Sequence, residues 1–166
     1  MHIHWYPGHI AKAEKQLKEL INLVDVVIEV IDARIPASSC YPNIKKLLGE
    51  KPRLILFNKS DLADEKKLDY WKKYFEQETG FPVLKTCASK NNDISAIENK
   101  IAELGKEKID KLVAKGLLPR PVRVVVVGMP NVGKSSIINK LIKKSKTKVG
   151  AKAGVTRQQQ WVRVNP

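Results

Sequence analysis

Apolar runs alternate with amphipathic stretches along most of the chain. The short aliphatic and β-branched runs predict strands, which we place at residues 26–31, 53–57, 83–86, 122–127 and 159–164. Apolar residues at helical spacing, together with cap and breaker residues, predict helices at residues 10–23, 45–49, 62–79, from 93 onward and after 133. Alternation of this kind favours an α/β fold with a mainly parallel sheet, whose ligands bind at the carboxyl ends of the strands.

The strand predicted at 122–127 is followed by Gly-Met-Pro-Asn-Val-Gly-Lys-Ser at 128–135, which matches the phosphate-loop pattern. Gly128 and Gly133 let the backbone turn around a phosphate, whose charge then faces exposed N–H groups and a helix N-terminus. We expect Lys134 to contact the β- and γ-phosphates and Ser135 to bind Mg²⁺. The predicted nucleotide-binding segment also includes Pro130, Asn131, Val132 and Ser136. The alternative is a glycine-rich turn with an unrelated lysine.

The strand predicted at 53–57 is followed by Asn58-Lys59-Ser60-Asp61, an N-K-x-D motif. An ionised Asp61 can accept hydrogen bonds from N1–H and the exocyclic amine of guanine, whereas adenine would oppose it with an acceptor. We expect Lys59 to lie along the base and Asn58 to tie the strand end to the phosphate loop. The alternative is an Asx turn that caps the helix predicted from residue 62.

Residues 86–90, Thr-Cys-Ala-Ser-Lys, follow the third predicted strand and resemble the S-A-K segment of GTPases. Cys87 stands where serine is usual, and this change keeps the side-chain size. The backbone N–H of Ala88 would contact the guanine O6, with Ser89 beside it. Taken alone this match is weak, and its position after a strand supports it.

The net charge of +14 is concentrated in the C-terminal third of the chain. Residues 111–166 contain 13 Lys or Arg and no Asp or Glu, while the preceding residues carry a net charge of +1. Such segregation favours a polyanionic partner such as RNA. The alternative is a solvated basic surface whose charge a bound nucleotide partly offsets.

Other features of the composition narrow the class of protein. No apolar run approaches the ~18 residues that a membrane span requires. The two cysteines, Cys40 and Cys87, lack metal-ligand spacing, and we expect reduced thiols. The first ten residues carry no secretory pattern. These features predict a cytoplasmic protein with no membrane contact.

The order of the motifs is unusual, because the guanine motif precedes the phosphate loop. With three further segments, it resembles the YlqF/YawG (RbgA-like) family of circularly permuted TRAFAC GTPases. These segments are Trp-Tyr-Pro-Gly-His at 5–9, Asp-Val-Val-Ile-Glu-Val-Ile-Asp-Ala-Arg-Ile-Pro at 25–36 and Gly-Val-Thr-Arg at 154–157. The resemblance covers essentially the whole chain.

This resemblance implies a three-layer P-loop GTPase fold in one permuted G domain. The guanine-reading half would span residues 1–105, a connector 106–121, and the phosphate-loop and switch half 122–166. Thr156 would be the switch threonine that joins Ser135 on Mg²⁺. The family implies GTP hydrolysis, binding of GTP and GDP, a monomer, and a role with rRNA in assembly of the large ribosomal subunit.

Two departures from the family pattern affect these expectations. Ala153 replaces a frequent proline, and no D-x-x-G motif follows Thr156. We therefore expect a truncated chain, with the D-x-x-G motif and an RNA-binding domain beyond residue 166, and weak activity for the 166 residues alone.

Three hypotheses about the chemistry remain open. His9 would orient the attacking water, as the resemblance implies, or act only as a surface or capping residue. Asn131 would help place K⁺, or only satisfy the loop backbone. Asp32 ends a Walker B-like strand, which would suit an ATPase, although the N-K-x-D motif argues against that. A nucleotide-gated RNA- or ribosome-binding module with little turnover is the alternative to an enzyme.

Overall fold

The computed structural model describes residues 8–87 and 93–144. A sheet of four parallel strands runs through the centre, in the order β3-β2-β1-β4. The strands are β1 (Val26–Asp32), β2 (Arg53–Asn58), β3 (Val83–Lys85) and β4 (Val124–Val127). The helices are α1 (Gly8–Ile21), α2 (Pro36–Ser39), α3 (Ile44–Leu48), the 3-10 turn η1 (Ser60–Leu62), α4 (Glu65–Thr79), α5 (Asp93–Ala114) and α6 (Lys134–Lys144).

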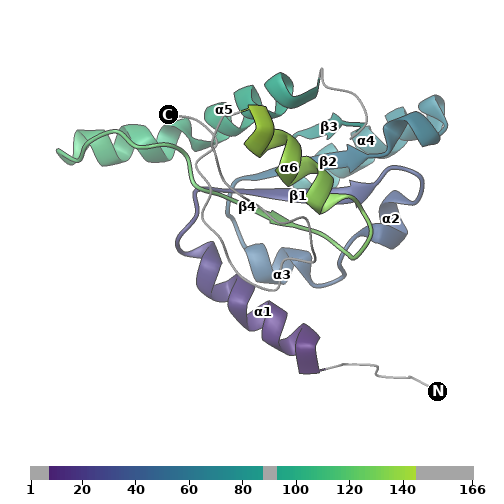
Figure 1. The fold of residues 1–166 in the computed structure, drawn as a ribbon, viewed down its shortest axis with the longest axis horizontal. Helices are drawn as coiled ribbons and strands as arrows, with labels where there is room; N and C mark the ends of the chain where they lie inside the picture. The colour runs from purple at the N-terminus through teal and green to yellow at the C-terminus, as the bar shows by residue number, and fades with distance from the viewer. Residues whose placement is uncertain (1–7, 88–92, 145–166) are drawn as a thin grey trace.

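Helices cover both faces of the sheet and make three layers (Figure 1). One face of the sheet packs against α5 and α6 through a core that includes Ile28, Leu56, Ile97 and Ile137. The other face packs against α4 through Phe57 and Phe75, and against α1 and α3 in a separate cluster. Because both faces are covered, β1 and β2 are buried along their whole length. The predicted α/β, three-layer fold is confirmed.

The helix predicted at residues 62–79 begins later than its apolar spacing indicates, since α4 starts at Glu65. Asp64 caps α4 by accepting the N–H of Lys67, at 2.9 Å, and the preceding residues form η1. At its other end α4 stops at Gly80, which adopts φ +72°, as the breaker signal predicts. The capping carboxylate therefore separates the guanine motif from the helix that follows it.

Gly105 lies inside a continuous helix. Gly105 ends the predicted guanine-reading half, but α5 continues past it to Ala114 and takes up the first part of the predicted connector. A Cβ on Gly105 would lie 2.6 Å from the side chain of Val122. Gly105 thus permits close packing of the chain leading into β4, a tertiary reason that helical periodicity does not reveal.

β4 is only half-buried, whereas its apolar sequence predicts burial on both faces. Within the described residues it pairs with β1 alone. The strand predicted at 159–164 lies outside the described residues.

An ion pair fastens the connector to the start of β1. Arg120 donates to both carboxylate oxygens of Asp25, at 2.7 and 3.0 Å, and the N–H of Arg123 donates to the same carboxylate at 2.8 Å. Burial raises the pKa of Asp25, but these hydrogen bonds and the two positive charges outweigh burial and hold its pKa below the usual value. The carboxylate thus joins the start of β1 to the segment that leads into β4.

Asp25→Asn should therefore destabilise the fold by about 1–3 kcal/mol at pH 7, since an amide loses the charge that both arginines contact. The pKa of Asp25 is lower in the folded state than its value of about 3.9 in the unfolded chain, so the ionised carboxylate stabilises the protein above about pH 3.9. This stabilisation is lost as the pH falls through the folded-state pKa. Urea unfolding at pH 7 and at about pH 3.5 should show the difference between wild type and D25N shrinking in acid. An equal difference at both pH values would contradict this role of Asp25.

Candidate functional site

Asn58 joins the end of β2 to the loop that follows β4. Its side-chain amide, 1% exposed, donates from Nδ2 to the carbonyl of Val132 at 2.9 Å. Its Oδ1 accepts the hydroxyl of Thr86, just past β3, at 3.3 Å. Asn58 therefore connects three strand ends, including the predicted tie to the phosphate loop. Because the amide of Asn58 is used in these two contacts and Asp64 caps the helix that follows, the Asx-turn alternative is wrong.

Lys59 makes a second connection between the two motifs. Its backbone is in the left-handed region, at φ +60°, and its ammonium donates to the carbonyl of Asn131 at 2.7 Å. The same ammonium lies 3.2 Å from a carboxylate oxygen of Asp32. Residues 58 and 59 therefore each donate to a backbone carbonyl of a loop more than 70 positions further along the chain.

Asp32 is the buried anchor of this arrangement. Arg34 donates to it from Nε and Nη2, at 3.0 and 2.8 Å, and from its backbone N–H at 3.0 Å. The Arg34 hydrogen bonds, with Lys59, keep the pKa of Asp32 far below its usual range despite the opposing effect of burial. Asp32 therefore positions the lysine of the guanine motif. This contact argues against the ATPase alternative, in which Asp32 would serve a metal.

The loop at 128–133 leaves no room for side chains at its glycines. A Cβ on Gly133, where φ is +99°, would lie 2.2 Å from Nδ2 of Asn58. A Cβ on Gly128 would lie 2.6 Å from the carbonyl oxygen of Val30 in β1. Asn131 also has a left-handed backbone, at φ +65°. The loop therefore turns tightly against β1 and the end of β2, as a phosphate-binding backbone requires.

Lys134 and Ser135 open α6 directly after this loop. The ammonium of Lys134 is half-buried and donates to the carbonyls of Gly128 and Met129, at 2.6 and 2.9 Å. Burial lowers the pKa of this lysine. The hydroxyl-bearing residues Ser135 and Ser136 are exposed in the first turn of the helix. The loop thus presents a cation, a helix N-terminus and two hydroxyls at one place.

The remaining described residues of the guanine motif lie between β2 and β3. The N–H of Ser60 donates to the carbonyl of Thr86 at 3.1 Å, and Asp61 is exposed on η1. Cys87 is buried, and its N–H donates to the carboxylate of Asp93 at 2.9 Å. The guanine motif and the start of the predicted S-A-K segment therefore lie side by side.

Several predicted site residues lie outside the described part of the chain. These are Ala88 and Ser89 of the S-A-K segment and Thr156 of the switch. The backbone of His9 belongs to α1, but its side chain is also outside the description. Their roles stay predictions.

Sequence reasoning missed three contributors to the site. Thr86 positions Asn58, Arg34 fixes Asp32, and Asp93 holds the backbone at Cys87. Thr86 and Asp93 stand at element ends beside a recognised motif, a position that could have marked them. The pairing of Asp32 with Lys59 depends on β1 and β2 being neighbours in register, Asp32 beside Asn58.

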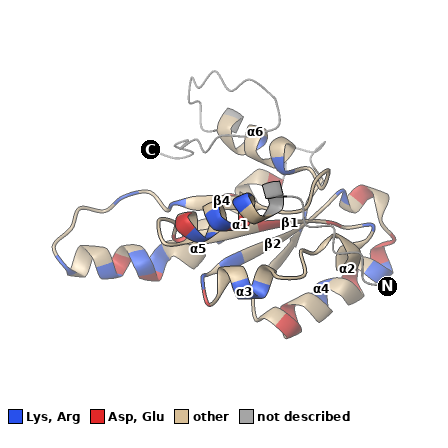
Figure 2. Cartoon of the chain, turned by 90° about the horizontal axis from the view of Figure 1, so that it is seen from below, with Lys and Arg blue, Asp and Glu red and all other residues tan. Residues whose placement is uncertain are grey.

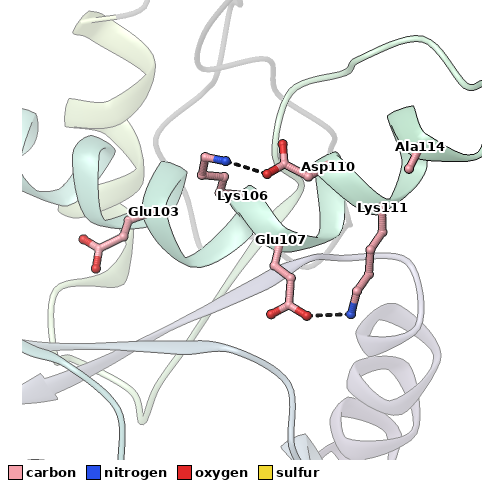
Figure 3. A pocket seen from close by; sticks show the side chains of 6 residues that line it. All are labelled: Glu103, Lys106, Glu107, Asp110, Lys111 and Ala114. Atoms are coloured by element: carbon pink, nitrogen blue, oxygen red, sulfur yellow. Dashed lines mark hydrogen bonds and ion pairs between the residues drawn. The ribbon is translucent and has the colours of Figure 1, made fainter.

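A hollow elsewhere does not compete with this site. It has a volume of about 520 Å³ and is lined by six residues of α5 alone, Glu103, Lys106, Glu107, Asp110, Lys111 and Ala114 (Figure 3). Four of its charged side chains pair with one another, Lys106 with Asp110 and Glu107 with Lys111, and the fifth, Glu103, pairs with Lys100. Among the described residues, no group of three or more His, Cys, Asp or Glu could hold a metal ion, and no helix is long and apolar enough to cross a membrane.

Two family models match different parts of the chain. The model described as 50S ribosome-binding GTPase matches residues 123–166, and the model described as Ferrous iron transport protein B matches residues 10–101. The first match includes the phosphate loop and the second includes the guanine motif. The guanine motif and the phosphate loop, which contact each other in the fold, are thus matched by two different family models.

Curated relatives match the chain from end to end. Ribosome biogenesis GTPase A of Bacillus cereus is 47% identical over 99% of this chain and 55% of its own length. The protein of the same name from Bacillus licheniformis is 47% identical over 99% of this chain and 58% of its own length. The chain therefore spans a little over half the length of these relatives.

A solved structure shares the fold. The structure described as the GDP-bound structure of TM YlqF aligns with a TM-score of 0.58 and 34% identity. The alignment covers 78% of this chain and 48% of that one.

Proposed function

The chain belongs to the YlqF/YawG (RbgA-like) family of circularly permuted GTPases, and from that premise we propose that it is the G domain of a GTP-hydrolysing assembly factor for the large ribosomal subunit. One observation carries the nucleotide part of this proposal. Asn58 and Lys59 of the guanine motif donate to the carbonyls of Val132 and Asn131 in the phosphate loop. Base recognition and phosphate recognition are therefore parts of one site.

In this proposal the chain's residues divide the work of binding GTP and GDP. Asp61 accepts the two N–H groups of guanine, Lys59 lies along the base, and Cys87, Ala88 and Ser89 line its O6 edge. The loop backbone and Lys134 neutralise phosphate charge. Such positioning and charge neutralisation supply most of the catalysis in phosphoryl transfer.

The donor set suits a magnesium ion shared with the nucleotide. Mg²⁺ usually takes one or two protein ligands and fills its other positions with phosphate oxygens and water. Ser135, exposed in the first turn of α6, would be one ligand and Thr156 the other. Asn131, whose left-handed backbone forms part of the loop, would help to place K⁺. When bound, these cations supply positive charge beside the transferred phosphate.

His9 is the proposed group that orients the attacking water. It belongs to the first turn of α1, directly after Gly8. The family resemblance supports this role, and a general-base histidine acts through hydrogen-bond reach to water.

Charge supports the proposed partner. The C-terminal third holds 13 of the 31 basic residues and none of the 17 acidic ones, a distribution that suits rRNA in a large subunit. The names of the curated relatives support the same partner. A monomer in the cytoplasm fits this role.

Turnover measurements test the proposal. GTP hydrolysis by the chain should be slow alone and faster with large ribosomal subunits and K⁺, and H9A should slow it while leaving GTP affinity intact. Tight GTP binding without turnover under any of these conditions would instead favour the nucleotide-gated binding module. Unchanged turnover of H9A on the ribosomal particle would exclude the role proposed for His9.

A further inference from the structure

Helix α4 presents an outer face that combines aromatic rings with positive charge. Leu68 and Phe75 on its inner face are buried against the sheet. The opposite face carries Lys66, Tyr70 and Tyr74 at four-residue spacing, so these side chains are neighbours on the helix. Lys67 and Lys73 border the row, and both are exposed. We call these five residues the α4 outer face. In Figure 2 α4 runs along an edge of the molecule.

The two tyrosines are exposed yet held in place. Tyr70 and Tyr74 are 64% and 44% exposed. Each makes an edge-to-face contact with Trp71, at ring-centroid distances of 5.8 and 5.6 Å. Trp71 in turn packs on the buried Phe75 at 6.3 Å. Ring faces anchored in this way can take a stacked partner at little cost in side-chain entropy.

The charge of the α4 outer face is not used within the described part of the molecule. Lys66, Lys67 and Lys73 make no ion pair with the residues that the structure describes. Two acidic residues of α4 are engaged elsewhere, since Asp69 pairs with Lys85 and Glu76 accepts the N–H of Val83. Glu78 is exposed one helical turn beyond Tyr74, at the border of the face. The face therefore offers three positive charges around two ring faces, with one carboxylate at its C-terminal border.

We propose that the α4 outer face binds an unpaired stretch of RNA, with bases stacked on Tyr70 and Tyr74 and phosphates contacted by the bordering lysines. Aromatic side chains within a basic surface are the means by which proteins bind single-stranded nucleic acid. The face lies on the opposite side of the sheet from α5 and α6, so it adds a second contact to that of the basic C-terminal third. The inference rests on the proposed ribosomal role for the source of the RNA.

Binding of a labelled oligouridylate of about 12 nucleotides tests the inference, since single-strand modules cover sites of this length. The Y70A/Y74A variant should bind at least about tenfold more weakly, because stacking contributes 1–3 kcal/mol per base. The Y70F/Y74F variant, which keeps both rings, should bind like wild type. The K66A/K73A variant should lower the slope of log affinity against log salt by about 1.4, as expected for two lost phosphate contacts.

A matched control removes the same charge elsewhere. Lys12 and Lys15 are exposed on α1, and K12A/K15A should keep the affinity within about twofold at 0.15 M salt, where charges beyond about 8 Å are screened. GTP binding, measured on every variant, tests the fold and the proposed nucleotide site independently of RNA binding, and it should not change.

Wild-type oligonucleotide affinity in Y70A/Y74A would overturn the inference, as would equal losses of affinity in K12A/K15A and K66A/K73A. If Y70A/Y74A weakened binding to ribosomal particles but not to the oligonucleotide, the face would bind a protein and the inference would be wrong.

Discussion

Replacing Gly133 with alanine should lower GTP affinity by about 100-fold. The added Cβ would lie 2.2 Å from the side-chain amide of Asn58, and the backbone there has φ +99°. Asn58 cannot move aside without losing its hydrogen bonds to Val132 and Thr86. Backbone strain costs about 1–3 kcal/mol, and a broken buried hydrogen bond costs a similar amount. Together they lower GTP affinity by about two orders of magnitude. Titration calorimetry with GTP measures the effect.

Gly116 offers a matched control. Its φ of +82° is as unfavourable for alanine, but no atom lies within 4 Å of the position a Cβ would occupy. G116A should lose about 1 kcal/mol of stability and keep its GTP affinity. If G133A bound GTP as well as G116A does, the contact between Asn58 and the loop would not be important for binding.

Glu29→Leu should lower the free energy of unfolding by about 3–5 kcal/mol, because it leaves the charge of Arg53 buried without a partner. The two side chains are 3% and 6% exposed and lie 3.0 Å apart between the sheet and its covering helices. Arg53 also stacks 5.0 Å from the ring centroid of Phe81. Burial raises the pKa of Glu29, which the Arg53 charge opposes. Since small domains are stable by only 5–15 kcal/mol, the loss is a large share.

The double variant E29L/R53M tests the reason for that loss. With both charges removed, apolar side chains fill the space, and most of the stability should return. Urea unfolding followed by circular dichroism compares the three proteins. A double variant no more stable than E29L would show that lost packing, rather than the unpaired charge, causes the effect. Wild-type stability of E29L would contradict both explanations.

The strand positions and the main site contacts could be predicted from the sequence because local signals carry them. The apolar run at 53–57 ends at the N-K-x-D motif, and β2 ends at Asn58 as the motif requires. The Gly-Lys-Ser of the loop marks the start of α6. Apolar spacing was less informative about helix ends, since the cap residue Asp64 decides where α4 begins.

The features that could not be predicted depend on which strands are neighbours. Glu29 reads as one polar position in an apolar strand, and its partner Arg53 lies on the adjacent strand. Asp32 ends a Walker B-like strand, a pattern that would suit an ATPase, yet it fixes Lys59 because β1 and β2 pair in register. Gly105 stands at the boundary predicted for the connector, and only its contact with Val122 explains its place inside α5.

The proposed function requires one guanine-nucleotide site built from two distant segments of the chain, the guanine motif at 58–61 and the phosphate loop at 128–135. Titration of the wild-type chain with GDP and with ADP tests that claim most directly, with D61N as the matched variant. We predict that GDP binds at least about 10³-fold more tightly than ADP, since adenine would set an acceptor against the Asp61 carboxylate and leave polar groups unpaired. We also predict that D61N loses most of this preference. Equal affinities for GDP and ADP in the wild-type chain would contradict the proposed function.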